Sequence, residues 1–449
     1  MKQSTCLREF ARYTALSVLG TLGVSCYILA DTFFVSKGLG TNGLAALNLA
    51  IPVYNFIHGT GLMLGMGGAI KFSVCKGYGD QDTGNRLYTN TLYLAILFSV
   101  LFLMPGIFGA DALAGLLGAD SAVRKMTATY LRWLLLFSPA FILNDVLLCF
   151  VRNDDGPQLT MAAMLTGSFA NILLDYLFIF PMQMGIFGAI LATGLSPLIS
   201  IVMMTPHWKR KCNSFHIVKT GPCAEMIRWH FSLGFPSLVA QISSGIVMIV
   251  FNGIILRLEG NIGVAAYGVI ANLSLVVTAV YTGIAQGVQP LVSSFYGAGE
   301  HRTIRTVLRY AMITMLSLSG IIYLLIAVYA QPIAALFNQE GHPHLQRIAV
   351  TGLRLYFISA PLTGYNIILA TFFTSIEKAL PAHILSVLRG LVLIIPAAFI
   401  LSSLWGMTGI WLTCPVTELM VAAPGLLIYH KVKAGITDAN RPKYPGKET

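Results

Sequence analysis

Asp31 and Asp175 are acidic residues inside long apolar segments. Their surroundings read CYILADTFFV and NILLDYLFIF, and the second lies in an apolar run from Gln158 to Pro181. An Asp at the centre of a membrane-spanning helix costs about 2.5–3.5 kcal/mol, and its short side chain cannot reach the membrane interface. Acids in such positions usually exchange a proton or bind a cation. We therefore interpret Asp31 and Asp175 as parts of one proton- or cation-binding site.

The spacing of these acids predicts that they lie at similar depth. Asp175 precedes Pro181 by about 9 Å of helical rise, and Asp31 lies near the outer end of the first predicted helix. Asn171 is one turn before Asp175 on the same helical face, where its amide could steady either protonation state. Two neighbouring carboxylates in a low dielectric repel each other, so such a pair can take up H⁺ or hold Na⁺ with further oxygen ligands. The alternative is that hydroxyls and water satisfy each acid and that neither has a functional role.

The composition requires membrane helices to position these residues. The chain has 449 residues, of which 56% are hydrophobic and 10% are charged, whereas soluble domains carry about 25% charged residues. A hydrocarbon core needs roughly 20 apolar residues per helix. We predict an all-α integral membrane protein with twelve transmembrane helices arranged as two pseudo-symmetric six-helix bundles. The predicted helices lie near 13–36, 44–70, 88–110, 128–151, 158–181, 186–207, 231–256, 264–291, 310–333, 351–375, 382–404 and 407–430.

Basic residues predict the orientation. They gather in loops on one side of the predicted bundle, including the run HWKRKCNSFHIVK and the C-terminal tail. By the positive-inside rule both termini are cytoplasmic, and the net charge of +11 reflects cytoplasmic loops rather than nucleic-acid binding. The long basic loop that starts near residue 208 divides the chain into an N-terminal lobe, 1–212, and a C-terminal lobe, 213–449, which ends in a short basic tail.

The two halves resemble each other. A constant offset of 220 residues aligns Gly40 with Gly260 and Gly77 with Gly297, and further on an offset of 222 aligns Asn144 with Asn366. An even number of spans per half inserts both halves the same way, with an axis along the membrane normal and a shared cavity between them. Such an architecture is typical of alternating-access transporters. A channel is the alternative, although channels more often assemble from several short chains around a pore.

The buried acids differ between the halves. At the repeat offsets Asp31 aligns with Phe251, and Asp175 aligns with Pro396 or Ala397. The two carboxylates therefore belong to the N-terminal half alone. Two other intramembrane acids have open roles. Glu418 either attracts cationic compounds or hydrogen-bonds a neighbouring helix. For Asp145, near the cytoplasmic end of its helix, we predict a structural ion pair with Arg152.

Four segments carry a resemblance to a known family. They are YILADTFFVSKGLG with GLAALNLAIP, SVCKGYGD, GIAQGVQPLVSSFYGAGE and NILLDYLFIF. Their order, spacing and duplication resemble those of multidrug and toxic compound extrusion (MATE) transporters over nearly the whole chain. The resemblance implies two six-helix lobes around a V-shaped cavity. It also implies efflux of bulky, often cationic organic compounds in exchange for H⁺ or Na⁺.

The resemblance also implies site residues. Asp31, Asn171 and Asp175 correspond to the N-lobe proton or cation site, and Thr193 and Tyr130 lie where relatives place a hydroxyl and a phenol beside it. If the ion is Na⁺, its ligands would be Asp31, Asn171, Asp175 and Thr193. The second-lobe carboxylates of some Na⁺-linked members are missing, so coupling should lie in the N-terminal lobe.

Further expectations concern the cavity and its partners. Residues predicted for the cavity wall are Glu418, Gln286, Tyr281 and Asn366. We expect a monomeric protein of the plasma (inner) membrane that contacts lipids and small drug-like molecules, binds no nucleic acid and needs no cofactor beyond its coupling ion. A lipid-linked oligosaccharide flippase of the same superfamily is the first alternative. A membrane enzyme is a distant one, because H-E-x-x-H, G-x-S-x-G and phosphate-cradling motifs are all missing.

Overall fold

The computed structural model describes residues 3–209, 213–338 and 341–438, and within these ranges the chain is helical with no β-strand. Long apolar runs favour helices in a membrane because each backbone group is then hydrogen-bonded within its own segment. The helices of the first lobe are α1 (Gln3–Tyr78), α2 (Gln81–Phe108), α3 (Ala110–Leu116), α4 (Arg124–Leu136), α5 (Ser138–Asn153), α6 (Pro157–Ile179), α7 (Gly185–Met204) and α8 (Pro206–Lys209). Those of the second lobe are α9 (Ala224–Gly297), α10 (His301–Val328), α11 (Ala330–Phe337), α12 (Pro343–Tyr356), the 3₁₀ turn Phe357–Ser359, α13 (Ala360–Ser375), α14 (Ala379–Val387), the π-helical turn Leu388–Val392 and α15 (Ile394–Asp438).

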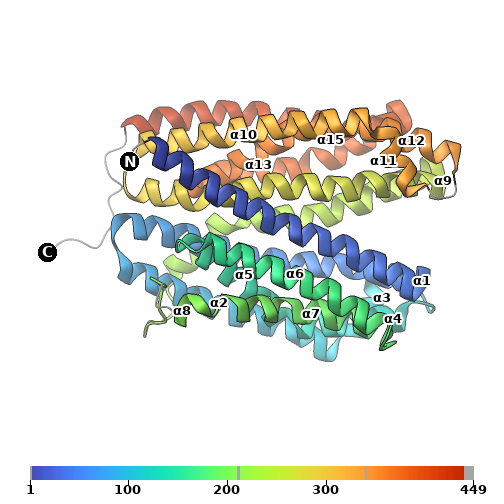
Figure 1. Cartoon of the computed structure of the whole chain (residues 1–449), viewed down its shortest axis with the longest axis horizontal. Coiled ribbons are helices and arrows are strands. Elements are labelled where there is room, and N and C mark those ends of the chain that lie inside the picture. The colour runs from blue at the N-terminus through green and yellow to red at the C-terminus, as the bar shows by residue number, and fades with distance from the viewer. Residues whose placement is uncertain (1–2, 210–212, 339–340, 439–449) are drawn as a thin grey trace.

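The described residues form twelve membrane spans. Nine segments are long and apolar enough to cross a membrane when the bent pair α4 and α5 counts as one. Three of them, α1, α9 and α15, contain a glycine with positive φ, at Gly40, Gly260 and Gly406, where the chain turns back (Figure 1). Counting these three twice gives twelve. The predicted number of spans and the two-lobe arrangement are confirmed.

The sequence repeat is visible in the backbone. Residues with φ between about +50° and +90°, a region that favours glycine, occur in pairs separated by 220 to 223 positions. Only Gln183 among those in the described ranges lacks a counterpart. The pairs are Gly40 and Gly260, Gly79 and Gly299, Gly118 and Gly341, Asp155 and Glu377, and Gly185 and Gly406. Each half therefore ends its helices with the same turns.

Glycines allow the lobes to meet closely around the axis that relates them. A Cβ atom on Gly77 would lie 2.3 Å from the carbonyl oxygen of Ser294, and one on Gly297 would lie 2.1 Å from that of Val74. The two contacts are equivalent in the repeat, because the offset of 220 aligns Val74 with Ser294 and Gly77 with Gly297. Any larger side chain at either glycine would push the lobes apart.

Polar contacts between the lobes lie on the side where α1 begins and α15 ends (Figure 1). They include Lys71 with Glu377 at 2.5 Å, Thr91 with His230 at 2.6 Å and Asn153 with Gln289 at 3.0 Å. A hydrogen bond of 3.5 Å joins Asn55 to Ser244. Across the ranges that the structure describes, no hydrogen bond, ion pair or ring contact joins residues 26–54 to the second lobe. Among the described residues, the polar contacts between the lobes therefore extend from the side where α1 begins to about the middle of the helices.

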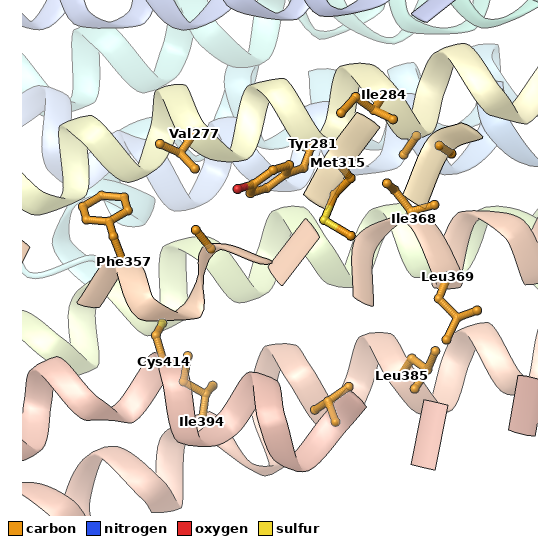
Figure 2. Packing of buried hydrophobic residues seen from close by; sticks show 14 of the residues in the cluster. Val277, Tyr281, Ile284, Met315, Phe357, Ile368, Leu369, Leu385, Ile394 and Cys414 are labelled. Carbon is orange, nitrogen blue, oxygen red and sulfur yellow. The ribbon is translucent and has the colours of Figure 1, made fainter. Parts of the chain in front are cut away.

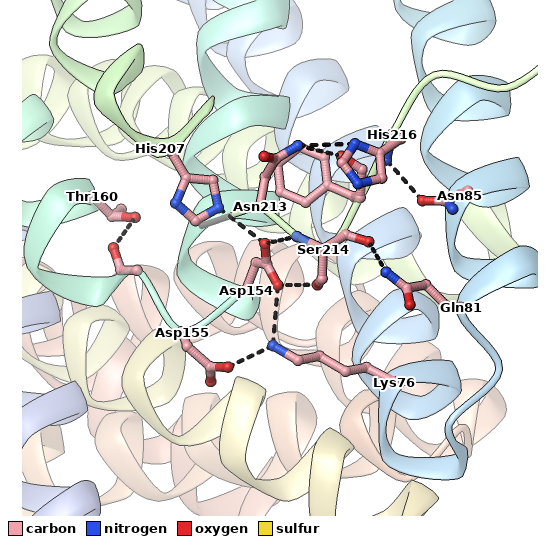
Figure 3. Close-up of polar contacts among 12 residues, drawn as sticks. Lys76, Gln81, Asn85, Asp154, Asp155, Thr160, His207, Asn213, Ser214 and His216 are labelled. Atoms are coloured by element: carbon pink, nitrogen blue, oxygen red, sulfur yellow. Dashed lines mark hydrogen bonds and ion pairs between the residues drawn. The ribbon is translucent and has the colours of Figure 1, made fainter. Parts of the chain in front are cut away.

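Residues 213–223, which connect the lobes, pack on the first lobe (Figure 3). Asp154 accepts hydrogen bonds from His207 Nε2 at 2.9 Å and from the backbone N–H of Ser214 at 2.7 Å, and it pairs with Lys76 Nζ at 3.0 Å. Burial alone would raise the pKa of Asp154, but these hydrogen bonds and the Lys76 charge outweigh it and lower the pKa to about 2. Phe215 is fully buried in the first-lobe core.

Two sequence-based expectations fall partly outside the described residues. The predicted domain boundary after residue 212 follows the undescribed residues 210–212, and most of the predicted basic tail lies in residues 439–449. The segment that begins the predicted second domain nevertheless belongs structurally with the first lobe as far as Cys223, whose backbone N–H donates to Asn90 Oδ1 at 2.9 Å.

Candidate functional site

Asp31 and Asp175 lie together inside the first lobe. Asp31 comes from the first half of α1, before the turn at Gly40, and is 8% exposed, and Asp175 comes from α6 and is fully buried. Their carboxyl groups are close enough to interact directly. Two carboxyl groups so placed can share one proton, because a second negative charge beside the first is strongly disfavoured in a low dielectric.

The surroundings of the pair offer unused oxygen atoms. When both acids are ionised, Asp31 Oδ1 and both oxygens of Asp175 find no hydrogen-bond donor in the described part of the chain. Asn171, one turn before Asp175, is also fully buried, and neither polar atom of its side chain has a protein partner there. Buried polar groups are normally satisfied, so these atoms indicate a place for a proton, a cation or water.

Tyr130 and Thr193 complete this group. Tyr130 of α4 is buried and close enough to Asp31, to Asp175 and to Thr193 of α7 to interact with them electrostatically. The Thr193 hydroxyl donates to the Ala189 carbonyl at 3.0 Å. The five residues predicted for the coupling site therefore converge from α1, α4, α6 and α7.

The equivalent place in the second lobe is apolar. Phe251, the counterpart of Asp31, lies 5.6 Å from Tyr267, which stacks on Trp411 at 6.3 Å. Gly352 takes the place of Tyr130, and a Cβ there would lie 2.9 Å from the Trp411 ring. In the second lobe, aromatic rings thus fill the space that is equivalent to the acid site of the first lobe.

Asp145 pairs with a different residue from the one predicted. Its carboxylate lies 2.8 Å from His58 Nδ1 on α1, so the expected ion pair with Arg152 is wrong. Seven residues separate Asp145 from Arg152, and about 10 Å of helical rise is too far for a direct contact. Arg152 instead directs Nη2 toward Met164 Sδ at 3.9 Å. Sequence reasoning missed His58, although a lone histidine in the second apolar span was a usable signal.

The four candidates for the cavity wall lie in three different surroundings. Glu418 is buried, accepting hydrogen bonds from Arg389 Nε at 2.6 Å and from Asn366 Nδ2 at 2.7 Å, so two of the candidates lie in one polar cluster. Tyr281 is fully buried in the second-lobe core beside Met315, and its hydroxyl is 2.8 Å from Ser319 Oγ (Figure 2). Its placement on a cavity wall is therefore wrong, since the ring fills the space between packed helices. Gln286 is half-buried, with Oε1 unpartnered among the described residues.

The fold and this site define a class of protein. Two bundles inserted in the same orientation, with buried carboxylates in one of them, are the architecture of a membrane transporter rather than an enzyme. The MatE family model matches residues 17–177 and 236–400. The chain belongs to the MATE family of multidrug and toxic compound extrusion transporters.

Known proteins of similar sequence and structure are consistent with membership of this family. Multidrug export protein MepA of Staphylococcus saprophyticus is 23% identical over 438 residues, which cover 97% of this chain and 96% of that protein. MepA of Staphylococcus aureus strain MSSA476 is 24% identical over 442 residues, covering 97% and 96%. The crystal structure of MATE in complex with MaL6 superimposes with a TM-score of 0.90 at 24% identity, over 98% of this chain and 100% of that one. An outward-facing conformation of a multidrug resistance MATE family transporter also has a TM-score of 0.90, at 23% identity over 98% and 99%.

Proposed function

We propose that this protein is a secondary active multidrug efflux antiporter that exports organic, often cationic compounds in exchange for H⁺ or Na⁺. Family membership and the relatives named as multidrug export proteins support the export of drugs. The observation that carries the coupling is the contact between Asp31 and Asp175, two buried acids in one lobe whose oxygens lack donors when ionised. The basic loops support a plasma-membrane protein with both termini in the cytoplasm.

The chemistry of the pair suits a small cation. One proton shared by the two carboxyl groups removes one of two adjacent negative charges. Na⁺ would use the same carboxylates with the oxygens of Asn171 and Thr193, which supply the hard oxygen ligands that such ions prefer. Tyr130 lies beside Thr193 and the two acids, where its phenol can help to position them.

The arrangement of the lobes supports an outward-open state. In the described part of the chain, their polar contacts extend from the side that the basic loops assign to the cytoplasm to Asn55 and Ser244 near the middle of the helices, while residues 26–54 form none with the second lobe. Ion uptake by the acid pair from outside favours release of the drug. The lobes then reopen to the cytoplasm, where the ion leaves and a new drug molecule binds. By linkage, the ion and the drug change each other's affinity by the same factor.

Efflux from proteoliposomes tests this function. Purified protein is reconstituted with ethidium inside the vesicles, and release is followed under an inward pH gradient, an inward Na⁺ gradient or neither. We expect one of the two ions to accelerate efflux well above the rate without a gradient. Equal rates under all three conditions would contradict antiport.

A further inference from the structure

His58 and Asp145 form a close contact that the coupling site does not use, and this contact is an ion pair when His58 is protonated. The His58 Nδ1 to Asp145 Oδ2 distance is 2.8 Å, and the carboxylate is almost completely buried while 27% of the His58 side chain is exposed. Gly61 makes the contact sterically feasible, because a Cβ there would lie 2.5 Å from Asp145 Oδ2. The imidazole therefore covers the acid on the accessible side.

The pair lies where the lobes separate. A Cβ on Gly59, next to His58, would lie 3.0 Å from Gln241 Cβ of the second lobe. Three residues before His58, Asn55 makes the long hydrogen bond to Ser244. Beyond that point residues 26–54 form no polar or ring contact with the second lobe in the described ranges. His58 thus stands at the inner limit of the region that we propose opens outward.

Aromatic rings surround the same pair. Tyr54 stacks on His58 with ring centroids 5.9 Å apart and an interplanar angle of 15°. Phe141 meets Tyr54 edge-on at 5.7 Å, and the hydroxyl groups of Tyr27 and Tyr54 are 2.9 Å apart, which fixes the Tyr54 ring. A carboxylate beside aromatic faces is the combination that binds organic cations.

We propose that Asp145 and Tyr54 bind an organic cation in competition with protonated His58. This proposal rests on the proposed export of cations and identifies where such a cation binds. A buried carboxylate left without a positive partner is strongly disfavoured. Protonated His58 supplies that partner in the empty protein, and the cation supplies it when bound. Binding therefore displaces the proton of His58 into the solution to which the site is open.

The response of His58 to pH can be distinguished from that of other titratable groups near the pair. Tyr27 and Tyr54 on α1 and Cys149 on α5 keep their protons between pH 5 and 8, and Arg152 on α5 remains charged. The neighbouring part of α9 offers Leu238, Gln241 and Ser244, none of which titrates. The Asp31 and Asp175 pair lies beyond Tyr27 and can also respond in this range. His230 of α9 can respond too, but its ring contacts Thr91 and the Met226 carbonyl rather than Asp145.

Binding of tetraphenylphosphonium to the purified full-length protein tests the proposal. The parent variant is Asp31→Asn/Asp175→Asn, which removes the response of the acid pair. We expect its Kd to rise as the pH falls from 8 to 5, approaching about tenfold per pH unit. Adding His58→Gln should give tight binding at every pH, whereas adding His58→Lys should give weak binding at every pH.

Two further measurements complete the test. Adding Asp145→Asn to the parent should weaken binding at pH 8 by at least about tenfold. In weakly buffered solution, the parent variant should release protons when tetraphenylphosphonium binds at pH 6 but release few at pH 8. This measurement needs no substitution of His58. An unchanged pH slope with His58→Gln, unchanged affinity with Asp145→Asn, or no proton release would each overturn the proposal. Failure of antiport would instead appear as missing gradient-driven efflux with this binding intact.

Discussion

Lys71 of α1 and Glu377, which follows α13, form an ion pair of 2.5 Å between the two lobes. Lys71 also lies 4.4 Å from the ring centroid of Trp229 at the start of α9. Glu377 holds a φ of +59°, as its repeat counterpart Asp155 does at +60°, but Asp155 pairs with Lys76 inside the first lobe. The two equivalent turns therefore place their acids differently. Asp155 pairs within the first lobe, whereas Glu377 pairs across the interface between the lobes. We infer that the Lys71 and Glu377 pair stabilises closure of the lobes on the side that we propose is cytoplasmic.

Glu377→Gln should loosen this closure. Losing the charge of a largely buried partner should shift the balance between open and closed forms by on the order of 1–3 kcal/mol, or 5- to 150-fold. Distances between spin labels on the cytoplasmic ends of the lobes should lengthen in part of the population. Asp111→Asn is the control, because its pair with Arg124 is exposed and lies within the first lobe. Identical distance distributions for Glu377→Gln and the wild type would contradict this role.

Gly77→Ala should separate the lobes by steric contact. The new methyl group would lie 2.3 Å from the Ser294 carbonyl oxygen, which cannot move without displacing α9. We expect faster labelling of cysteines introduced at the cytoplasmic end of the interface. Gly320→Ala is the matched control, since a Cβ there meets no atom within 4 Å. The prediction is wrong if both variants label at the wild-type rate.

Asp154→Asn should destabilise the first lobe. The change weakens the hydrogen bonds from His207 and Ser214 and removes the pairing with Lys76, which together should cost on the order of 2–3 kcal/mol. Thermal unfolding in detergent, followed by tryptophan fluorescence, should show a lower Tm. Asp155→Asn should have a smaller effect, because its side chain is largely exposed.

The pKa of Asp154 also predicts a pH dependence of the wild type. Its folded value of about 2 lies below that of an unfolded Asp, near 3.9. The stabilisation is therefore fully present above about pH 4 and is lost as the pH falls toward 2. In Asp154→Asn this contribution should be missing at every pH, so the Tm difference between the two proteins should shrink in acid. A difference that stays constant down to pH 2.5 would refute this assignment.

Asp31→Asn and Asp175→Asn should each raise the thermal stability while impairing transport. An isolated intramembrane acid costs about 2.5–3.5 kcal/mol at a helix centre, and a neutral amide of the same shape avoids much of that cost. A structural acid would behave in the opposite way, with a lower Tm in the amide variant. Differential scanning fluorimetry of the purified variants distinguishes the two cases.

The fold could be predicted from the sequence because its signals are long and repeated. Apolar runs of about 20 residues define the spans, and the offset of 220 that aligns Gly77 with Gly297 also describes their contact in the structure. The turns at Gly40 and Gly260 fall in the predicted gaps between helices 13–36 and 44–70 and between helices 231–256 and 264–291, so their positions were predicted as well. Their tightness was not predicted, because the helices continue on both sides of each glycine and a positive φ leaves little trace beyond the glycine itself.

The site was predicted less completely. Asp31, Asn171 and Asp175 lie together as expected, since depth and helical face follow from residue spacing. The contact between His58 and Asp145 depends on how α1 packs against α5, which hydropathy does not report. Tyr281 was misplaced because an aromatic residue in a span can line a cavity or fill a core, and only the neighbouring Ser319 and Met315 decide between them.

The most direct test compares two kinds of transport in Asp31→Asn and Asp175→Asn proteoliposomes. One measures ethidium efflux driven by the ion gradient that drives the wild type, and the other measures exchange of labelled for unlabelled ethidium without a gradient. If the acid pair couples the ion to the drug, gradient-driven efflux should fall by roughly tenfold or more while exchange continues. Gradient-driven efflux at the wild-type rate in both variants would contradict that coupling.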